Sequence, residues 1–222
     1  MIVIHHLNNS RSQRIVWLAE ELGLPYRVER YTRDPKTNLA PPELRAVHPL
    51  GKAPVIQDGE LVLAESGAIV TYLLERYGNG RLVPQKGTTE RVRYLHWLHF
   101  AEGTLMLHLI ARLYLGRVGE AANALLSRVN AMLGDELDLV EAELGRTAHL
   151  AGADFSASDI QMVFPLEFAA FLGLVEERHA NLREYLSRMQ ARPAYRRAVD
   201  KAGAYAFDPA SAAAAAPFPK IN

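Results

Sequence analysis

The chain has 222 residues, 25 Lys and Arg against 25 Asp and Glu, and no cysteine. This length allows one large domain or two small ones, and a hydrophobic fraction of 49% excludes a globally disordered chain. The balanced charge argues against binding to duplex DNA, which needs a dense basic face. Without cysteine there is no disulfide, no thiolate metal ligand and no cysteine nucleophile, so sulfur chemistry would have to use the sulfur of a ligand.

No run of about 18 apolar residues predicts a membrane span. The N-terminal residues 1–6 lack the basic region and the long apolar stretch of a signal peptide. We therefore expect a cytoplasmic protein whose partners include neither a membrane nor a nucleic acid.

The first part of the chain alternates between strand and helix patterns. Residues 2–4 form a short β-branched strand, and residues 12–22 have helical periodicity up to Gly23, where a C-terminal cap belongs. Residues 26–31 alternate between apolar and polar side chains, which predicts a second strand.

A proline-rich loop with a short helix near residues 42–47 comes next. Residues 55–57 and 61–63 are apolar runs separated by an Asp-Gly turn, the strongest short-range sign of a β-hairpin. A helix follows over residues 65–77. The order β-α-β-(α)-β-β-α indicates an α/β layer with a parallel first strand pair and an antiparallel hairpin at its end.

Strand patterns are absent beyond a linker at residues 81–88, and an all-helical domain over residues 89–206 is predicted. The helical stretches are residues 89–115, 121–144, 158–172 and 182–192. Ser156 and Asp159 form a variant of the capping box, with Phe155 placed for a hydrophobic staple. Residues 207–222 are a tail rich in Ala and Pro.

Three strings sharpen this organisation: HPLGKAPVI at 48–56, LAESGAI at 63–69 and FSASDI at 155–160. In this order and at these distances the chain resembles the cytosolic glutathione S-transferases over about residues 1–205. The string LNNSRSQRIVWL at 7–18 looks like bacterial and fungal members of the serine type, near the theta-like branch. The resemblance implies a thioredoxin-like α/β domain over residues 1–80, followed by an all-α helical bundle.

Glu65 and Ser66 open a helix directly after a strand. A helix N-terminus favours a bound carboxylate through its unpaired N–H groups and partial positive charge, and Glu65 can receive an ammonium group. The same pair also fits an ordinary helix cap. The resemblance implies that Glu65 and Ser66 bind the γ-glutamyl end of glutathione, which carries both charges.

Pro54 precedes a predicted strand, and residue physics alone favours an ordinary trans bond there. The resemblance implies instead a cis Ala53–Pro54 bond, with the backbone of Ala53 pairing with the cysteinyl part of glutathione. It also places Lys52 within reach of the glycyl carboxylate, although a solvated surface lysine fits the position too. His48 is a weaker candidate for the same role.

Ser10 is the candidate catalytic residue, because the resemblance aligns it with the activating serine of theta-like members. A free thiol has a pKa of about 8.5, and a hydroxyl donor stabilises the thiolate over the thiol. Each unit of pKa lowering needs about 1.4 kcal/mol, which one charge-assisted hydrogen bond can supply. Ser10 could instead be only a helix cap with Gln13. Asn9, Arg11 and Ser12 occupy the same turn, and Arg11 is the main competitor as a cation.

Glu102 lies in an apolar helical stretch beside Gly103, which costs about 1 kcal/mol in a helix and so indicates a close backbone approach. The resemblance implies that Glu102 reaches across a two-fold homodimer to the γ-glutamyl ammonium in the other subunit. A surface carboxylate paired with a nearby arginine is the alternative.

A metal site is not expected, because the spacing of the histidines in this region holds no consistent helix face and no carboxylate set completes a coordination shell. We expect the following residues to line a cavity for the acceptor substrate: His96, His99, Leu107, His108, Arg112 and Tyr114.

The resulting hypothesis is a dimeric glutathione transferase that conjugates glutathione to small hydrophobic electrophiles and uses no metal. One alternative is a glutathione-binding regulatory protein with weak activity, because fold does not fix function. A glutathione-dependent peroxidase is another. A disulfide or dehydroascorbate reductase is disfavoured, since such members use a protein cysteine near position 10 and this chain has none.

Overall fold

The computed structural model describes residues 1–203 and 205, which form two compact units. The first unit contains Met1–Val83 together with the segment that begins at Gln190, and the second contains Pro84–Met189. The Ala/Pro-rich tail at residues 207–222 lies outside the described residues. Across the described part of the chain, no helix is both long and apolar enough to cross a membrane.

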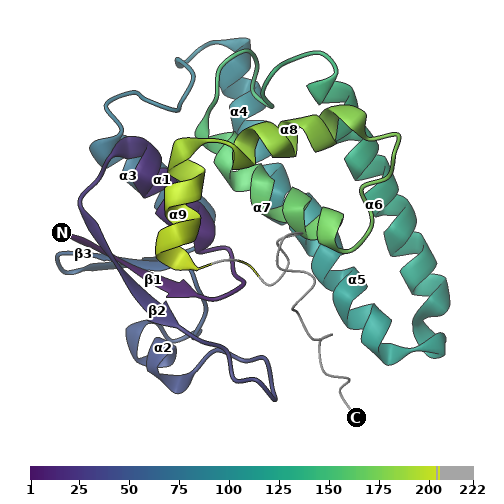
Figure 1. Ribbon diagram of the computed structural model, residues 1–222, viewed down its shortest axis with the longest axis horizontal. Coiled ribbons are helices and arrows are strands. Elements are labelled where there is room, and N and C mark those ends of the chain that lie inside the picture. The colour runs from purple at the N-terminus through teal and green to yellow at the C-terminus, as the bar shows by residue number, and fades with distance from the viewer. Residues whose placement is uncertain (204, 206–222) are drawn as a thin grey trace. The chain divides into compact units, whose positions relative to one another are not determined.

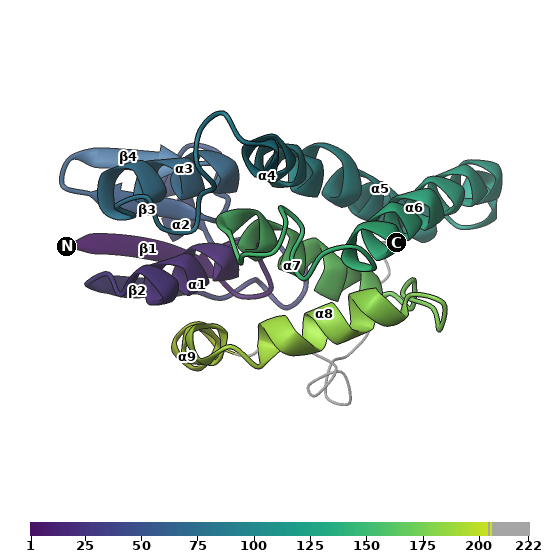
Figure 2. The same cartoon turned by 90° about the horizontal axis from the view of Figure 1, so that it is seen from above.

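A four-stranded sheet with the order β2-β1-β3-β4 forms the centre of the first unit (Figures 1 and 2). Its strands are β1 (Ile2–Leu7), β2 (Tyr26–Tyr31), β3 (Val55–Asp58) and β4 (Leu61–Ala64). β1 pairs with β2 in parallel, while the pairs β1–β3 and β3–β4 are antiparallel. The predicted parallel pair and the predicted hairpin are both confirmed.

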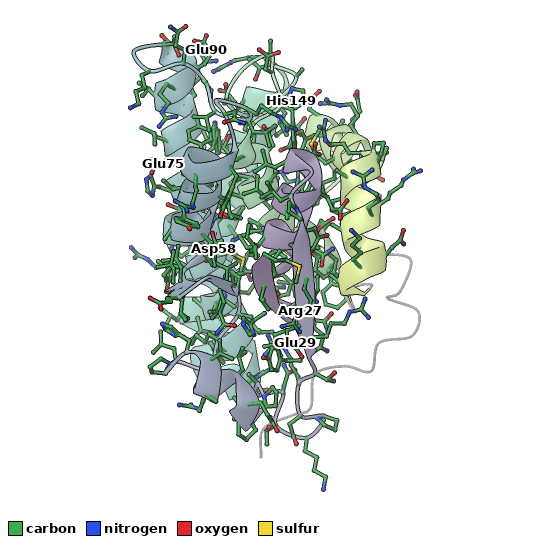
Figure 3. All side chains as sticks on the ribbon, turned by 90° about the vertical axis from the view of Figure 1, so that its left-hand side faces the viewer. Arg27, Glu29, Asp58, Glu75, Glu90 and His149 are labelled. Atoms are coloured by element: carbon green, nitrogen blue, oxygen red, sulfur yellow. The ribbon has the colours of Figure 1, made fainter. Side chains whose placement is uncertain are left out.

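Charged side chains lie on the outer strand β2 and protect it from pairing with another chain. Arg27 and Glu29 project from it and form an ion pair at this edge of the sheet (Figure 3). Charged side chains on an edge strand disfavour pairing with another chain.

Strand β1 is longer than predicted because two histidines are accommodated in the interior. His5 and His6 are 4% and 3% exposed. The His5 ring bonds the Tyr31 hydroxyl at 2.8 Å and Gln57 Oε1 at 3.1 Å, and His6 Nδ1 bonds the Ser12 hydroxyl at 2.9 Å. Buried polar groups that find hydrogen-bond partners can extend a strand that an apolar pattern alone would end.

The helices of the first unit are α1 (Gln13–Leu22), α2 (Pro42–Val47), α3 (Ser66–Tyr77) and α9 (Pro193–Ala202). α1 and α3 contact one another beside the sheet (Figure 1). α1 ends where predicted, at Gly23 with φ 65°, a left-handed conformation that glycine adopts without strain. Helix α9 was not predicted; it begins with Pro193 at the first helical position, where a missing N–H costs nothing.

Helix α9 packs on α1 through rings and charges. Trp17 and Tyr195 meet edge to face with ring centroids 5.0 Å apart. Glu20 receives Arg197 Nε at 2.6 Å and also pairs with Lys201. These contacts group α9 with the first unit. The boundaries proposed from the sequence, with a helical domain over residues 89–206, stay a prediction.

The described secondary structure of the second unit is helical apart from an isolated bridge between His149 and Gly152. Its elements are α4 (Thr89–Phe100), η1 (Ala101–Leu105), α5 (Met106–Val118), η2 (Glu120–Ala122), α6 (Asn123–Leu144), α7 (Ala157–Phe171) and α8 (Ala180–Gln190). The predicted helix over residues 89–115 is interrupted by the π-helical turn η1, which no feature of the sequence announces. The fold class is therefore as expected: a thioredoxin-like α/β domain followed by an all-α region.

Helix α7 is the central helix of this unit, and the predicted capping box at its start is confirmed. Asp159 Oδ2 accepts the Ser156 N–H at 2.8 Å. Its Oδ1 accepts the Leu150 N–H at 3.0 Å and the Tyr185 hydroxyl at 2.9 Å. One buried carboxylate thus joins the start of α7 to the preceding loop and to α8.

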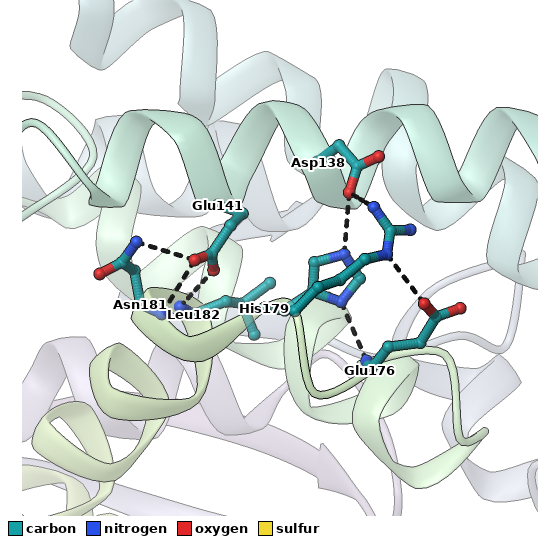
Figure 4. Close-up of polar contacts among 7 residues, drawn as sticks. Asp138, Glu141, Glu176, His179, Asn181 and Leu182 are labelled. Atoms are coloured by element: carbon teal, nitrogen blue, oxygen red, sulfur yellow. Dashed lines mark hydrogen bonds and ion pairs between the residues drawn. The ribbon is translucent and has the colours of Figure 1, made fainter.

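Carboxylates on α6 hold the start of α8 (Figure 4). Glu141 accepts the backbone N–H groups of Asn181 and Leu182 at 3.0 and 2.9 Å, so it caps the helix N-terminus from a neighbouring helix. Asp138, one turn earlier, pairs with Arg178 and with buried His179. Carboxylates at a helix N-terminus also oppose its positive end favourably.

Candidate functional site

The register of the sheet gathers three loop segments at one edge of the first unit. Val55, the first residue of β3, pairs with Ala64 at the end of β4 and with His5 in β1. Pro54 comes just before Val55 and Glu65 comes just after Ala64, so both lie at the same end of this hairpin. Strand β1 continues past His5 toward this end of the hairpin. The turn that follows β1 therefore begins at the same edge of the sheet.

The first segment contains a cis peptide bond between Ala53 and Pro54, as the resemblance implies. Pro54 is buried, Ala53 is half-buried and Lys52 is exposed. The backbone of Ala53 stands immediately before β3, where an extended ligand could pair with it. His48 shapes the loop before it, because its Nδ1 accepts the Leu50 N–H at 3.4 Å.

The second segment is the strained start of α3. Glu65 is an exposed, non-glycine residue with φ 70°, a conformation that costs about 1–3 kcal/mol and is often found at functional sites. The next residue, Ser66, is 3% exposed. Its hydroxyl accepts a hydrogen bond from Arg14 Nη1 at 3.2 Å.

Arg14 is a site residue that the sequence analysis did not single out. It is 1% exposed, and arginine remains charged at all ordinary pH values. A buried guanidinium beside Ser66 adds positive charge to the N-terminus of α3, where the helix already favours an anion. The one feature of the sequence that distinguishes Arg14 is its position four residues before Leu18, which places a charged residue on the apolar face of a predicted helix.

The third segment is the turn that contains Ser10. Ser10 is 6% exposed, and its Oγ lies 2.6 Å from Ser12 Oγ. The N-cap position of α1 is occupied by Ser12, so the alternative of a cap formed by Ser10 with Gln13 is not what the structure shows. Ser12 is fully buried, whereas Asn9 lies at the turn with φ 52°.

His6 lies behind this turn, on the inner side of Ser12. Burial, followed by the positive charge of Arg30, lowers the pKa of His6 to about 4. The imidazole is therefore neutral near pH 7, with a single ring proton. Nothing in the sequence marked His6 as part of the site, because a histidine within a strand is usually a packing residue.

Glu102 belongs to the second unit, in the π-helical turn η1, where it is half-buried. Such turns occur frequently at functional sites. Outside its own helix turn and its two chain neighbours, a Cβ placed on the exposed Gly103 would meet no atom of the described residues within 4 Å. The close backbone approach expected there is thus not made within this subunit as described.

The residues proposed to line an acceptor cavity have different surroundings. The His96 ring lies against Trp97, with centroids 4.8 Å apart. His108 Nδ1 bonds Glu136, and Arg112 Nε donates to Asn130 Oδ1 at 3.0 Å. Leu107, Tyr114 and His99 are exposed. Among the described residues, no group of three or more His, Cys, Asp or Glu could hold a metal ion.

The carboxyl group of Glu136, which bonds His108, is affected by burial. Desolvation raises the pKa of Glu136, and the hydrogen bond from His108 opposes that change. The pair lies between α5 and α6 of the second unit.

Comparison with known proteins identifies the family. Residues 1–75 match the family model of the glutathione S-transferase N-terminal domain. Glutathione S-transferase 3 of Schizosaccharomyces pombe is 33% identical over 214 residues, covering 90% of this chain and 88% of that protein. GstB of Escherichia coli is 30% identical and covers 90% of this chain and 98% of that protein. The chain belongs to the glutathione S-transferase family.

Solved structures agree with this assignment. A glutathione S-transferase from Actinobacillus pleuropneumoniae has a TM-score of 0.85 and 36% identity, covering 93% of this chain and 95% of that one. The transferase URE2P8 from Phanerochaete chrysosporium, solved with oxidized glutathione, has a TM-score of 0.75 and covers 90% of this chain and 94% of that one. At 20% identity the second structure shows a shared fold only.

Proposed function

We propose that this protein binds glutathione at the edge of the first unit, holds its sulfur as a thiolate, and transfers it to small hydrophobic electrophiles. The observation that carries the proposal is the start of α3, where exposed, strained Glu65 precedes buried Ser66, whose hydroxyl accepts a hydrogen bond from the Arg14 guanidinium. The register of β3 and β4 sets this cluster beside the cis Ala53–Pro54 bond.

The chemistry of each group matches one part of the tripeptide. The γ-glutamyl carboxylate binds the α3 N-terminus and Ser66, with Arg14 behind them, and the γ-glutamyl ammonium pairs with Glu65. The cysteinyl part pairs with the backbone of Ala53, as an added strand would. Lys52, exposed beside it, receives the glycyl carboxylate.

Ser10 stabilises the sulfur anion by donating a hydrogen bond. Near pH 7 only a few per cent of a free thiol with a pKa of about 8.5 is ionised. One charge-assisted hydrogen bond contributes about 1.5–3 kcal/mol, which corresponds to one or two units of pKa. Proximity to the bound electrophile supplies the larger part of the rate. This role of Ser10 would place the chain in the serine-type, theta-like branch.

The second unit completes the enzyme in this proposal. It supplies the apolar pocket for the electrophile, and Glu102 in η1 contacts the γ-glutamyl ammonium bound by the other subunit of a two-fold homodimer. The exposed Gly103 beside it leaves room for that approach. We also propose that the protein acts in the cytoplasm.

Calorimetry with glutathione and with an S-alkyl glutathione tests the binding step. We expect dissociation constants in the micromolar to millimolar range, about −4 to −8 kcal/mol. Absence of heat with both ligands would contradict the proposal. Light scattering of the same sample should give twice the subunit mass of 24.7 kDa, and a single subunit mass would refute the dimer.

Turnover is measured separately, with an aryl halide as a generic electrophile. Conjugation supports the transferase. Binding without conjugation would instead indicate a glutathione-binding regulatory protein, and peroxide reduction without conjugation would indicate a glutathione-dependent peroxidase.

A further inference from the structure

A continuous chain of hydrogen bonds runs from Ser10 into the interior of the first unit. Ser10 Oγ lies 2.6 Å from Ser12 Oγ, and Ser12 Oγ lies 2.9 Å from His6 Nδ1. The Leu7 N–H donates to Ser12 Oγ and the Ser12 N–H donates to Ser10 Oγ, both at 3.3 Å. All three side chains are at most 6% exposed.

Each hydroxyl has one proton and two acceptor sites, which limits how this chain can be arranged. In one arrangement Ser10 donates to Ser12, and Ser12 donates to an unprotonated His6 Nδ1. The proton of Ser10 is then used internally. Ser10 could accept a hydrogen bond from a thiol, but it could not donate one to a thiolate.

In the second arrangement the two bonds between side chains are reversed, while the backbone N–H groups donate as before. His6 carries its proton on Nδ1 and donates to Ser12, and Ser12 donates to Ser10. The acceptor sites of Ser10 are then filled by the N–H and the O–H of Ser12, and those of Ser12 by Leu7 N–H and His6 Nδ1–H. The Ser10 proton is then the only hydroxyl proton not used within this hydrogen-bond chain, so it is available to a group outside it.

We infer that His6 is a positioning residue which, through Ser12, directs the Ser10 hydroxyl toward the glutathione sulfur. This inference rests on the proposed function, since it assigns a use to the Ser10 proton. A bound thiolate favours the arrangement with the proton on His6 Nδ1, because this arrangement offers it a donor while both bonds that join Ser10, Ser12 and His6 are kept. A ligand shifts such an equilibrium by its differential affinity for the two states.

His6 directs the bond without storing the thiol proton. Its pKa of about 4 makes it a weak base, so the thiol proton leaves to solvent and the imidazole stays neutral. The charged group that acts on His6 is Arg30, its partner residue in the neighbouring strand β2, which opposes a second ring proton. A neutral imidazole that exchanges one tautomer for the other suits this role.

The test is the titration of the thiolate absorbance of bound glutathione. In His6→Leu the Ser12 hydroxyl no longer accepts from a ring N–H and can donate to Leu7 O, which lies 3.4 Å away, so that Ser10 donates to Ser12. We expect this variant to raise the pKa of the bound sulfur by about one unit, a tenfold loss of thiolate below that pKa. His6→Asn offers an amide N–H near the position of Nδ1 and should restore most of the shift. The dissociation constant of an S-alkyl glutathione, which has no thiol, should stay unchanged in both variants.

His5→Asn is the matched control, since His5 is an equally buried neighbour whose ring bonds Tyr31 and Gln57 instead of Ser12. It should leave the titration where it is. Ser12→Ala interrupts the chain at its middle and should resemble His6→Leu. If His6→Leu does not fold, Ser12→Ala is the variant used for the test.

A double-mutant cycle separates the possible failures. If Ser10→Ala raises the sulfur pKa, and His6→Leu adds nothing in the Ser10→Ala background, then His6 acts through Ser10. If Ser10→Ala shifts the titration and His6→Leu does not, or if the two shifts add, the positioning role is wrong and the catalytic role of Ser10 remains. If Ser10→Ala has no effect, the proposed role of Ser10 fails, and the role of His6 fails with it.

Discussion

The two units contain helix starts of similar composition whose acidic side chains use their oxygen atoms in different ways. At α7, Ser156 and Asp159 bond their own chain, and Asp159 further accepts from Leu150 and Tyr185. At α3, Glu65 makes no side-chain cap bond within the described chain and adopts a strained backbone conformation. Serine and acid at a helix N-terminus thus indicate either a closed structural cap or an open ligand site, and the partners decide which.

The difference has an energetic reason. A cap with every oxygen satisfied stabilises its helix by about 1 kcal/mol or more. A helix start whose first residue is held at a positive φ costs free energy. Such a conformation persists only where the surrounding structure enforces it. The open start of α3 is fixed by the hairpin register before it and by Arg14 beside Ser66. Binding of an anion there would offset the cost.

Asp159→Ala should have the largest effect on stability. It leaves the buried donors of Ser156, Leu150 and Tyr185 without their acceptor, and each unsatisfied donor costs about 1–3 kcal/mol. We expect the free energy of unfolding to fall by about 3–5 kcal/mol, measured by urea denaturation. Asp154→Ala, at an exposed position shortly before the helix, is the control and should cost less than about 0.5 kcal/mol. Equal losses would show that the α7 cap is not closed as described.

Glu65→Ala should have the opposite effect, with a large change in glutathione affinity and a small change in stability. Removing the proposed acceptor for the γ-glutamyl ammonium should weaken glutathione binding by about 10- to 100-fold, as expected for a bond to a charged group. Stability should change little, because the side chain is exposed. Calorimetry and thermal unfolding measure the two effects. Glu75→Ala, near the other end of α3 (Figure 3), removes the same charge and should leave the affinity unchanged.

Glu20 extends the comparison to a carboxylate that is used entirely within its own unit. Burial alone would raise its pKa, but hydrogen bonds from Lys201, Tyr26 and Arg197 lower the pKa to about 2. Because the folded pKa lies below the ordinary value of 4.5, this stabilisation is complete above about pH 5 and is lost as the pH falls toward 2.

Unfolding measured between pH 6 and pH 2 should therefore show wild type losing its advantage over Glu20→Gln as the pH decreases. Glu75→Gln serves as the exposed control and should follow wild type throughout. A constant difference between wild type and Glu20→Gln would mean that the charge of Glu20 does not hold α9 on α1.

Thr88→Ala should have the smallest effect of the four. The Thr88 hydroxyl accepts the Arg91 N–H at 3.2 Å and caps α4 at a half-buried position. We expect a loss of about 1 kcal/mol in the free energy of unfolding. Thr89→Ala changes the neighbouring exposed threonine and should be near neutral, so a similar loss in both variants would argue against capping.

Elements set by short-range patterns could be predicted from the sequence. The Asp-Gly turn and its flanking apolar runs predicted the hairpin, and Gly23 predicted the end of α1. Helix α9 was missed because its buried face consists of Tyr195 and the alanines 194, 198 and 202, which give a weak apolar pattern. The π-helical turn η1 was missed because its residues have ordinary helical periodicity.

The candidate site divides in the same way. Ala53, Pro54, Glu65 and Ser66 stand beside strand ends, so their common location follows from topology. Arg14 and His6 could not be found, because their significance arises from contacts across the interior with Ser66 and Ser12. A buried polar residue in an apolar pattern is ambiguous until its partner is known.

The two ends of the β3–β4 hairpin should differ in how they tolerate engineering. At one end, the pairing of Val55 with Ala64 sets the spacing between the cis Ala53–Pro54 bond and Glu65. At the other end, Gly59 and Glu60 form an exposed turn, where extra residues lengthen the loop without moving that pair. A peptide tag inserted between Gly59 and Glu60 should therefore leave the spacing at the site unchanged. A single residue inserted within either strand would shift the register and reverse the faces of the side chains beyond it.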